Sequence, residues 1–281
     1  MGVDWAARRA QLQSDGVCII EDVLDDAMLQ RVRAIAAAQI AALSADDRRE
    51  QRSTGSMVAN RHLPQLAELI AWPGTWDALA RLGYVDCKFS RAYLISKPPH
   101  SPQLFWHQDF TAWSGEPRAG DEVSPQLFAM FYLVDTDRAN GCLRIIPGSH
   151  RKRHPLHDQL GSAHSDASRR MDDPDAALYA SVPDERDLPA RAGDLVLGDG
   201  RALHAAHANT TACERPLITL WYHPDFSRLR EGTQRQISEL ARAEVEHWPE
   251  HNRRAVASMI ADYSGDAPAL PRDRVPGPNF V

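Results

Sequence analysis

The chain has 281 residues, of which 43% are hydrophobic and 25% are charged, which is ordinary for a globular protein and enough for one large domain. Its formal net charge is −6. This acidic balance argues against broad binding to nucleic acid or to anionic membranes, since both depend on a basic surface, and it favours small-molecule chemistry.

The four cysteines are widely scattered and include no CxxC pair, so the sequence predicts neither a disulfide framework nor a structural zinc cluster. The N-terminal residues contain no apolar core of signal-peptide length. No apolar run reaches the roughly 18 residues that a membrane span requires. We therefore expect reduced thiols and a cytoplasmic protein.

Residues 1–83 are predicted to be mostly helical. After a short β-branched run, GVCII, Asp25 fits the N-cap of a helix of about five turns whose apolar residues recur at helical spacing. Two further helical pieces are expected in LPQLAELIAWP and TWDALARLG, closed by Pro73 and Gly83.

Residues 84–226 differ from the preceding part in composition and pattern. Short segments rich in β-branched and aromatic residues are separated by Pro, Gly, Asn and Asp, which predicts the antiparallel strands of a sandwich or barrel. These segments are KFSRAYLIS, QLFAMFYLV, CLRIIPGS, DLPARAGDLVLGD and RPLITLWYH. The polar span 150–190 is an insertion of a length typical of lids or binding loops.

Residues 227–281 are predicted to form a helical extension and a tail. The segment GTQRQISELARAEVEHW predicts a C-terminal helix, and residues 264–281, rich in Pro and Gly, predict a loosely held tail. The expected fold class is therefore α+β, with N-terminal and C-terminal helices packed on an all-β core in a single domain.

The stretch FWHQDF places His107 and Asp109 among aromatic residues, where an unpaired charge is costly to bury. Residues i and i+2 of a strand project from one face, so these side chains can present a nitrogen and an oxygen towards one point. One more ligand would complete a triad of two histidines and one carboxylate, which leaves open positions on Fe(II).

The H-x-D pattern alone is weak, because it also occurs at residues 164–166 and 223–225. His164 lies in the polar insertion, where we expect a solvated surface group. The pair at 223–225 ends a predicted strand, and nothing strand-like follows to supply a third ligand. Only His107 has β segments on both sides.

The third metal ligand, distant in sequence from His107 and Asp109, is expected in the segment 192–222. His204 follows a strand and a turn, and we prefer it to His207 because residues three apart on a turn or strand usually face opposite ways. Arg215 opens the next strand. The N–H groups of its guanidinium can bind the distal carboxylate of a dicarboxylate co-substrate bidentately, whereas a lysine would offer only a point charge.

Three segments, SKPPHSPQLFWHQDF, NGCLRIIPGSHR and GDLVLGDGRALHAAHANTTACERP, resemble in order and spacing the phytanoyl-CoA dioxygenase (PhyH) family of Fe(II)/2-oxoglutarate-dependent oxygenases. The chain is also similar to ectoine hydroxylases. The resemblance implies a double-stranded β-helix, the cupin-like jelly roll. It also implies Fe(II) held by His107, Asp109 and His204, and 2-oxoglutarate anchored by Arg215.

The resemblance further implies 2-oxoglutarate contacts at Gln108 and at Tyr93. Some family members have a serine two residues after the distal histidine ligand, and this chain has Ala206 there. The hydrogen bond of that serine must be absent or supplied elsewhere, and Tyr93 or Thr219 would compensate.

Three further features concern the substrate. Trp113 is expected to form a wall of the substrate pocket. Asn209, in the family's H…N…R pattern, either braces the loop between ligand and arginine or contacts the substrate. The basic run RKRH at residues 151–154 either meets an anionic substrate at the mouth or is a solvated face.

The resemblance also narrows the reaction. Related halogenases replace the carboxylate ligand by a small residue, so the presence of Asp109 favours hydroxylation or another oxidation of a small molecule, with dioxygen decarboxylating 2-oxoglutarate to succinate. Two alternatives remain. One is a metal-dependent hydrolase or isomerase that uses the ion as a Lewis acid and has no need of Arg215. The other is a non-catalytic jelly-roll binding protein.

Overall fold

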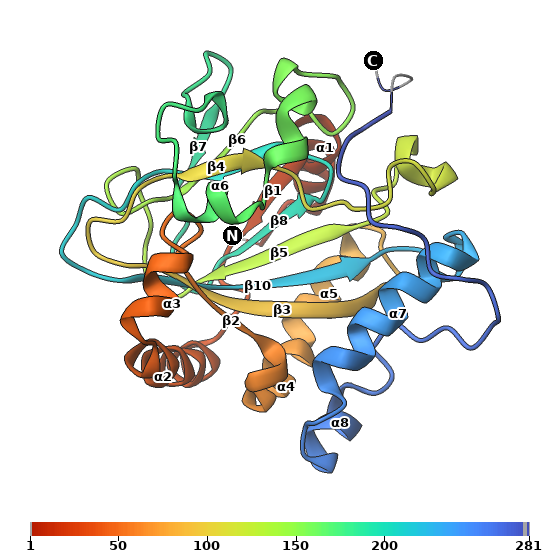
Figure 1. The fold of residues 1–281 in the computed structure, drawn as a ribbon. Coiled ribbons are helices and arrows are strands. Elements are labelled where there is room, and N and C mark those ends of the chain that lie inside the picture. The colour runs from red at the N-terminus through yellow and green to blue at the C-terminus, as the bar shows by residue number, and fades with distance from the viewer. Residues whose placement is uncertain (1, 278–279, 281) are drawn as a thin grey trace.

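The computed structural model describes residues 2–277 and 280 and contains two antiparallel sheets that face each other (Figure 1). The larger sheet has the order β1 (Val17–Ile20), β8 (Leu195–Asp199), β5 (Leu127–Tyr132), β10 (Arg215–His223), β3 (Lys88–Lys97) and β2 (Ser56–Ala59). The smaller sheet has the order β4 (Leu104–His107), β9 (His204–Ala206), β6 (Leu143–Ile145) and β7 (Arg186–Leu188). This is the predicted α+β jelly roll, and each of the five predicted β segments contributes at least one strand.

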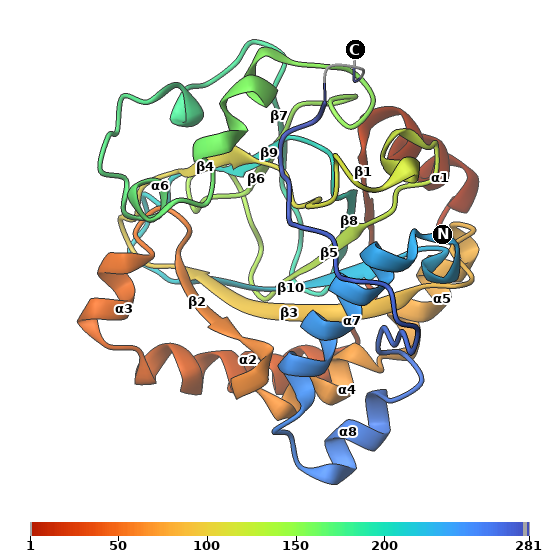
Figure 2. The same cartoon turned by 45° about the vertical axis from the view of Figure 1, so that its right-hand side comes forward.

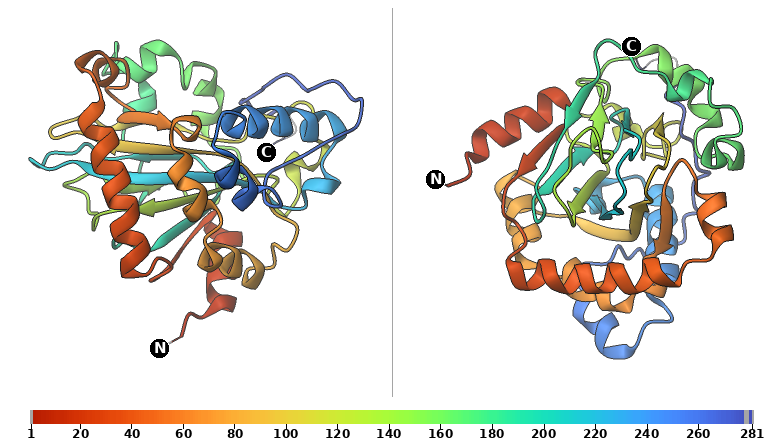
Figure 3. Two further views of the ribbon diagram at one scale, coloured as in Figure 1. Left: turned by 90° about the horizontal axis from the view of Figure 1, so that it is seen from below. Right: turned by 90° about the vertical axis from the view of Figure 1, so that its left-hand side faces the viewer.

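Helices cover the outer face of the larger sheet (Figures 1 and 2). The helices of the described chain are α1 (Trp5–Asp15), α2 (Asp26–Ala42), α3 (Ala45–Glu50), α4 (Ala67–Ile70), α5 (Pro73–Arg81), α6 (Asp166–Arg170), α7 (Glu231–Val245) and α8 (Glu250–Val256). Asp25 is the N-cap of α2, as predicted, and accepts a hydrogen bond from the Met28 amide at 2.7 Å. Apolar residues of α2 pack on the sheet, and the helix runs across its strands (Figure 3).

The polar stretch after α2 contains two elements that the sequence analysis did not predict. Ser44 and Asp47 form a reciprocal capping box that starts the short helix α3. Strand β2 then pairs with β3 at the edge of the larger sheet. The N-terminal part is therefore mostly helical, with two edge strands, β1 and β2.

The insertion at 150–190 is an ordered cover. It contains two 3-10 segments, η4 (Pro155–Ser162) and η5 (Ala177–Tyr179), on either side of α6. Apolar side chains from these segments pack with Phe105 and Trp106 on the outer face of the smaller sheet. The insertion thus buries this face, much as α2 and α4 bury the other sheet.

The C-terminal helix is confirmed as α7, but the expectation of a loosely held tail is wrong for residues 272–274. The Asp273 amide donates to the Thr111 carbonyl at 2.8 Å. Gln108 Nε2 donates to the Arg274 carbonyl, and Arg274 Nη1 donates to the Gln108 carbonyl at 3.2 Å. These hydrogen bonds tie the tail to the segment after β4, and Figure 2 shows it running from α7 towards the smaller sheet. None of the described helices is long and apolar enough to cross a membrane.

Candidate metal centre and active-site cavity

Two histidines lie directly opposite each other on neighbouring strands of the smaller sheet. His107 ends β4, His204 begins β9, and their ring centroids are 4.1 Å apart. The Nδ1 atoms lie 3.1 Å from the Phe105 carbonyl oxygen and 3.0 Å from the Ala202 carbonyl oxygen. An Nδ1–H that donates to a carbonyl leaves Nε2 with its lone pair, which is the usual arrangement of a metal-binding histidine.

Asp109 is positioned by a turn rather than by a strand. Strand β4 ends at His107, so Asp109 lies beyond it. The expectation that His107 and Asp109 project from the same face of one strand is therefore wrong, although the two side chains do lie close together. Instead, the amides of Asp109 and Phe110 both donate to the Gly200 carbonyl at 2.8 Å. The indole Nε1 of Trp221 donates to Asp109 Oδ2 at 2.8 Å and fixes the carboxylate.

The Asp109 carboxylate lies close to both histidines. Asp109 Oδ1 lies 3.9 Å from His107 Nε2, and Asp109 Oδ2 lies 3.8 Å from His204 Nε2. Metal–ligand bonds of about 2 Å allow two ligands of one ion to be up to about 4 Å apart. Two imidazoles and a carboxylate are the donor set of a non-haem Fe(II) site with open positions.

The charge states of these groups suit metal binding. Burial, together with the neighbouring His204, lowers the pKa of His107 to about 3, so its imidazole is neutral at physiological pH. Burial opposes ionisation of Asp109, but His204, His107 and the hydrogen bond from Trp221 outweigh it and hold the pKa of this carboxyl below its ordinary value. Metal ligands must be deprotonated, and both groups are.

His164 is the main surprise of the site, because the expectation of a solvated surface histidine is wrong. Its ring is half-buried and lies edge-on to the rings of His107, at 4.8 Å, and Phe105, at 5.2 Å. His107, Asp109 and His164 each offer a ligand atom within 4.8 Å of the others, and His164 Nε2 is buried without a hydrogen-bond partner. The apolar packing of the insertion, to which the preceding Ala163 belongs, brings this residue inwards.

A buried ion pair stabilises the turn that presents the Gly200 carbonyl. The Arg201 guanidinium is 1% exposed and donates to both carboxylate oxygens of Asp199, at 2.7 and 3.0 Å. Its third nitrogen, Nη1, donates to the carbonyls of Ala119 and Asp121 at 2.8 Å. This network joins the turn between β8 and β9 to the loop that follows the metal motif.

Removing this arginine is expected to destabilise the fold strongly. Arg201→Gln leaves Asp199 buried without its partner, a change that costs about 3–5 kcal/mol, whereas Arg186→Gln breaks an exposed pair with Asp15 and costs at most about 1 kcal/mol. Urea unfolding of both variants measures the difference, and equal midpoints would contradict the prediction.

The same pair predicts a pH dependence. Burial opposes ionisation of Asp199, but the Arg201 charge outweighs it and lowers the pKa of the carboxyl. The stabilisation is therefore complete above the ordinary carboxyl pKa near 3.8 and is lost as pH falls through the lowered value. In Arg201→Gln the carboxyl loses this partner, so acid unfolding is expected to begin at a higher pH than in the parent protein.

A cavity runs from the candidate metal ligands, between the sheets, to Arg215 at the start of β10. The Arg215 guanidinium is 2% exposed, and its Nε and Nη1 atoms have no hydrogen-bond partner. Its nearest aromatic neighbour is Tyr132, whose ring centroid is 5.3 Å from Cζ. A buried guanidinium without a carboxylate partner is costly, so the cavity is suited to receive an anion.

Lys97 adds a buried amine to this cavity, and the sequence analysis missed it although it lies in the SKPP motif. It is 1% exposed, and its Nζ donates to the carbonyls of Ser53, at 3.2 Å, and Pro102, at 2.5 Å. Burial, together with the nearby charge of Arg215, holds the pKa of this amine well below its ordinary value. Among the described residues that line the cavity, Asp109 is the only acid. The far end of the cavity thus holds the Arg215 guanidinium, and the near end holds the metal ligands.

The other residues expected at the co-substrate differ in their placement. Thr219 lines the cavity with a buried hydroxyl that has no hydrogen-bond partner, and Ala206 lines it without offering a hydroxyl. Tyr93 pairs with Thr219 in register and lines a larger opening in front of the metal ligands. The Gln108 side chain does not line the cavity, since its Nε2 donates to the Arg274 carbonyl.

Two other candidates lie outside the cavities at the metal ligands. Trp113 packs between the rings of Phe110, at 5.4 Å, and Phe280, at 4.9 Å, so the structure gives it a place in a small aromatic cluster. His207 pairs with Asp187 at 2.5 Å, away from His204.

Asn209 is fully buried and braces the loop before β10. Its Nδ2 donates to three backbone carbonyls, those of Lys97, Pro98 and Cys213, at 3.0, 3.1 and 2.7 Å. Its Oδ1 accepts a hydrogen bond from the Thr211 hydroxyl. Of the two roles expected for Asn209, this geometry favours the bracing one.

The fold is a cupin-like jelly roll, and its buried histidines and carboxylate suit a metal ion. Residues 12–217 match the phytanoyl-CoA dioxygenase (PhyH) family, and the chain belongs to that family. The ectoine dioxygenase of Sphingopyxis alaskensis is 26% identical over 245 residues, which are 80% of this chain and 78% of that protein. The chain is therefore an oxygenase.

Solved structures share this fold. The non-heme alpha-ketoglutarate-dependent epimerase SnoN from nogalamycin biosynthesis has a TM-score of 0.58 at 21% identity and covers 78% of this chain and 80% of its own. EctD from S. alaskensis, solved with 2-oxoglutarate and 5-hydroxyectoine, has a TM-score of 0.56 at 23% identity, with coverages of 80% and 78%. These likenesses concern the fold.

Proposed function

We propose that this chain is an Fe(II)- and 2-oxoglutarate-dependent dioxygenase that oxidises an unactivated C–H bond of a small molecule. The observation that carries the proposal is the buried guanidinium of Arg215, which has unpaired donors in a cavity that is also lined by two histidines and a carboxylate. A co-substrate with a carboxylate at each end matches this arrangement.

The proposed iron ligands are His107, Asp109 and His204. His204 is preferred to His164 as the third ligand because its Nδ1 is anchored to a backbone carbonyl and its strand is paired in register with β4. No hydrogen bond within the described residues fixes the ring of His164. Ligands held by such outer contacts bind metal more tightly than unsupported ones.

The iron, when bound, supplies the position at which 2-oxoglutarate and dioxygen react. Arg215 binds the distal carboxylate through paired N–H donors, and the buried Thr219 hydroxyl is a further donor within the cavity. Trp221 keeps Asp109 oriented, and apolar side chains along the cavity exclude water. Overall, substrate, 2-oxoglutarate and O2 give hydroxylated substrate, succinate and CO2.

The substrate is proposed to enter through the larger opening, which has about 1510 Å³ of space and reaches His107 and Asp109. Tyr93 and His164 also line it. Because Asp109 occupies the carboxylate position, hydroxylation or a related oxidation is favoured over halogenation. Small-molecule oxidation also agrees with the acidic composition of the chain.

Succinate formation tests the proposal directly. Protein prepared without oxygen and loaded with Fe(II) is expected to show a visible charge-transfer band when 2-oxoglutarate is added, and to release succinate when O2 is admitted. Asp109→Ala is expected to abolish both signals, whereas Asp187→Ala, which removes a carboxylate bound to His207 instead, is expected to keep them. Succinate release that survives Asp109→Ala would contradict the proposal.

A further inference from the structure

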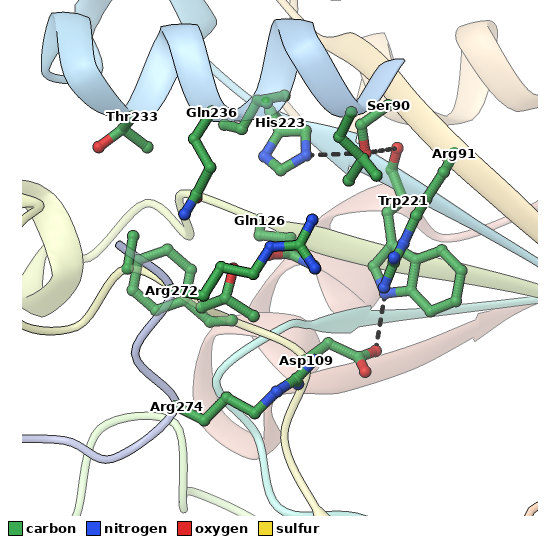
Figure 4. Close-up of a pocket in the computed structure, with 15 residues that line it drawn as sticks. Ser90, Arg91, Asp109, Gln126, Trp221, His223, Thr233, Gln236, Arg272 and Arg274 are labelled. Carbon is green, nitrogen blue, oxygen red and sulfur yellow. Dashed lines mark hydrogen bonds between the residues drawn. The ribbon is translucent and has the colours of Figure 1, made fainter. Parts of the chain in front are cut away.

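A second cavity lies on the other side of Asp109, between β3, β10, α7 and the C-terminal tail (Figure 4). Three arginines line it: Arg91 from β3, and Arg272 and Arg274 from the tail. In Figure 4 the two tail arginines extend from one side towards Asp109 and towards Arg91 on the other side. The same three residues also line the larger opening in front of the metal ligands, so the two spaces share this basic wall.

Within the described part of the chain, none of these guanidinium groups forms an ion pair, although the charge of Asp109 acts on Arg274. Arg91 lies over the rings of Trp221, at 5.1 Å, and Tyr93, at 5.3 Å, and Arg274 donates to a backbone carbonyl. Burial lowers the pKa of Arg274, and the charges of Arg91 and Arg272 add to this effect against the opposing charge of Asp109.

The tail is built to present two of these arginines together. Asp273 forms a bridge with Ala112, as in a short strand, and its amide donates to the Thr111 carbonyl at 2.8 Å. Residues on either side of a bridged strand residue project from the same face. Arg272 and Arg274 therefore share a face, and Figure 4 shows it turned to the cavity.

The basic run at 151–154 is a weaker candidate for an anion site than the sequence suggested. Arg151 pairs with Glu122 at 3.1 Å, and Arg153 pairs with Asp158 at 2.6 Å. Neither residue lines the cavities at Asp109. The unpaired positive charge lies at Arg91, Arg272 and Arg274 instead.

We propose that the substrate carries an anionic oxygen group, a phosphate or a carboxylate, which Arg91, Arg272 and Arg274 bind beside the metal centre. Planar guanidinium groups bind such oxyanions through paired hydrogen bonds, and three of them suit a group with several acceptor oxygens. That this anion belongs to the molecule being oxidised rests on the proposed function; the anion site itself does not. Its occupant would link the tail to β3 and complete one wall of the substrate opening.

Binding of simple anions to the metal-free protein tests the site. We expect calorimetric titration with inorganic phosphate, and separately with acetate, to show binding of at least one, which identifies the preferred oxyanion. Arg91→Gln and Arg274→Gln are each expected to weaken this binding by about tenfold or more, because each removes charge-assisted hydrogen bonds. Arg228→Gln, which removes an exposed arginine outside the cavities, is expected to change it by less than about twofold.

Trypsin cleavage at Arg272 and Arg274 gives a second readout. The bound anion is expected to slow cleavage of the tail in the parent protein and in Arg228→Gln, but not in Arg91→Gln, since Arg91 lies on a strand and acts on the tail only through a shared ligand. Absence of anion binding, or equal losses in Arg91→Gln and Arg228→Gln, would overturn the site. Anion binding without succinate release would keep the site and overturn only the oxygenase proposal.

Discussion

His204→Ala is expected to lose iron binding and succinate release, whereas His164→Ala is expected to retain bound iron. His204 contributes an Nε2 atom 3.8 Å from Asp109, on a strand paired directly with that of His107. Losing an outer contact of a metal ligand lowers affinity by about 10–100-fold, so losing the ligand itself is expected to cost more than about 100-fold. His164 approaches the same atoms from an insertion, without a hydrogen bond that fixes its ring.

Metal content after anaerobic Fe(II) loading and desalting measures this difference, and the charge-transfer band with 2-oxoglutarate measures it independently of turnover. His207→Ala is the matched control, because it removes a histidine of the same strand region that binds Asp187 instead. Iron retained in His204→Ala but lost in His164→Ala would identify the insertion histidine as the third ligand and refute the proposed triad.

The three histidines near Asp109 show what local sequence contains and what it does not. Strands β4 and β9, which carry His107 and His204, are short and contain no β-branched residue, and neither was among the predicted strand segments. Their pairing therefore became visible only in the structure. The position of His164 was not predicted either, because the insertion is largely polar. Its ring lies against Phe105, which belongs to a buried cluster formed by segments far apart in the chain.

The tail and the loop of Asp109 depend on backbone hydrogen bonds, which leave no periodic pattern. Asp109 is held by the Gly200 carbonyl, and Asp273 is held by the Thr111 carbonyl. Side-chain type does not encode such partners, so the sequence predicted a strand position for Asp109 and a loose tail. The arginines of the tail consequently escaped notice, and an anionic substrate was considered only at the more conspicuous run RKRH, as an alternative to a solvated face.

Arg215→Gln is expected to raise the dissociation constant of 2-oxoglutarate by about 100-fold or more, because it removes two charge-assisted hydrogen bonds, each contributing about 1.5–3 kcal/mol. In the ligand-free protein the same substitution is expected to be favourable, because it stabilises the fold. Arg215 is 2% exposed with two unpaired donor atoms, and the buried amine of Lys97 lines the same cavity. Removing a buried charge that has no acidic partner relieves its desolvation, so the ligand-free variant is expected to melt at a higher temperature than the parent protein.

Weaker binding of 2-oxoglutarate together with a higher melting temperature distinguishes a co-substrate anchor from a structural arginine. Titration of the charge-transfer band gives the dissociation constant, and thermal unfolding with and without 2-oxoglutarate gives the stability. Arg201→Gln is the matched control, because that arginine is equally buried but paired with Asp199, and its loss is expected to lower the melting temperature. If Arg215→Gln also lowered the melting temperature and left 2-oxoglutarate binding intact, Arg215 would be a structural residue, and the dicarboxylate would have to be bound elsewhere.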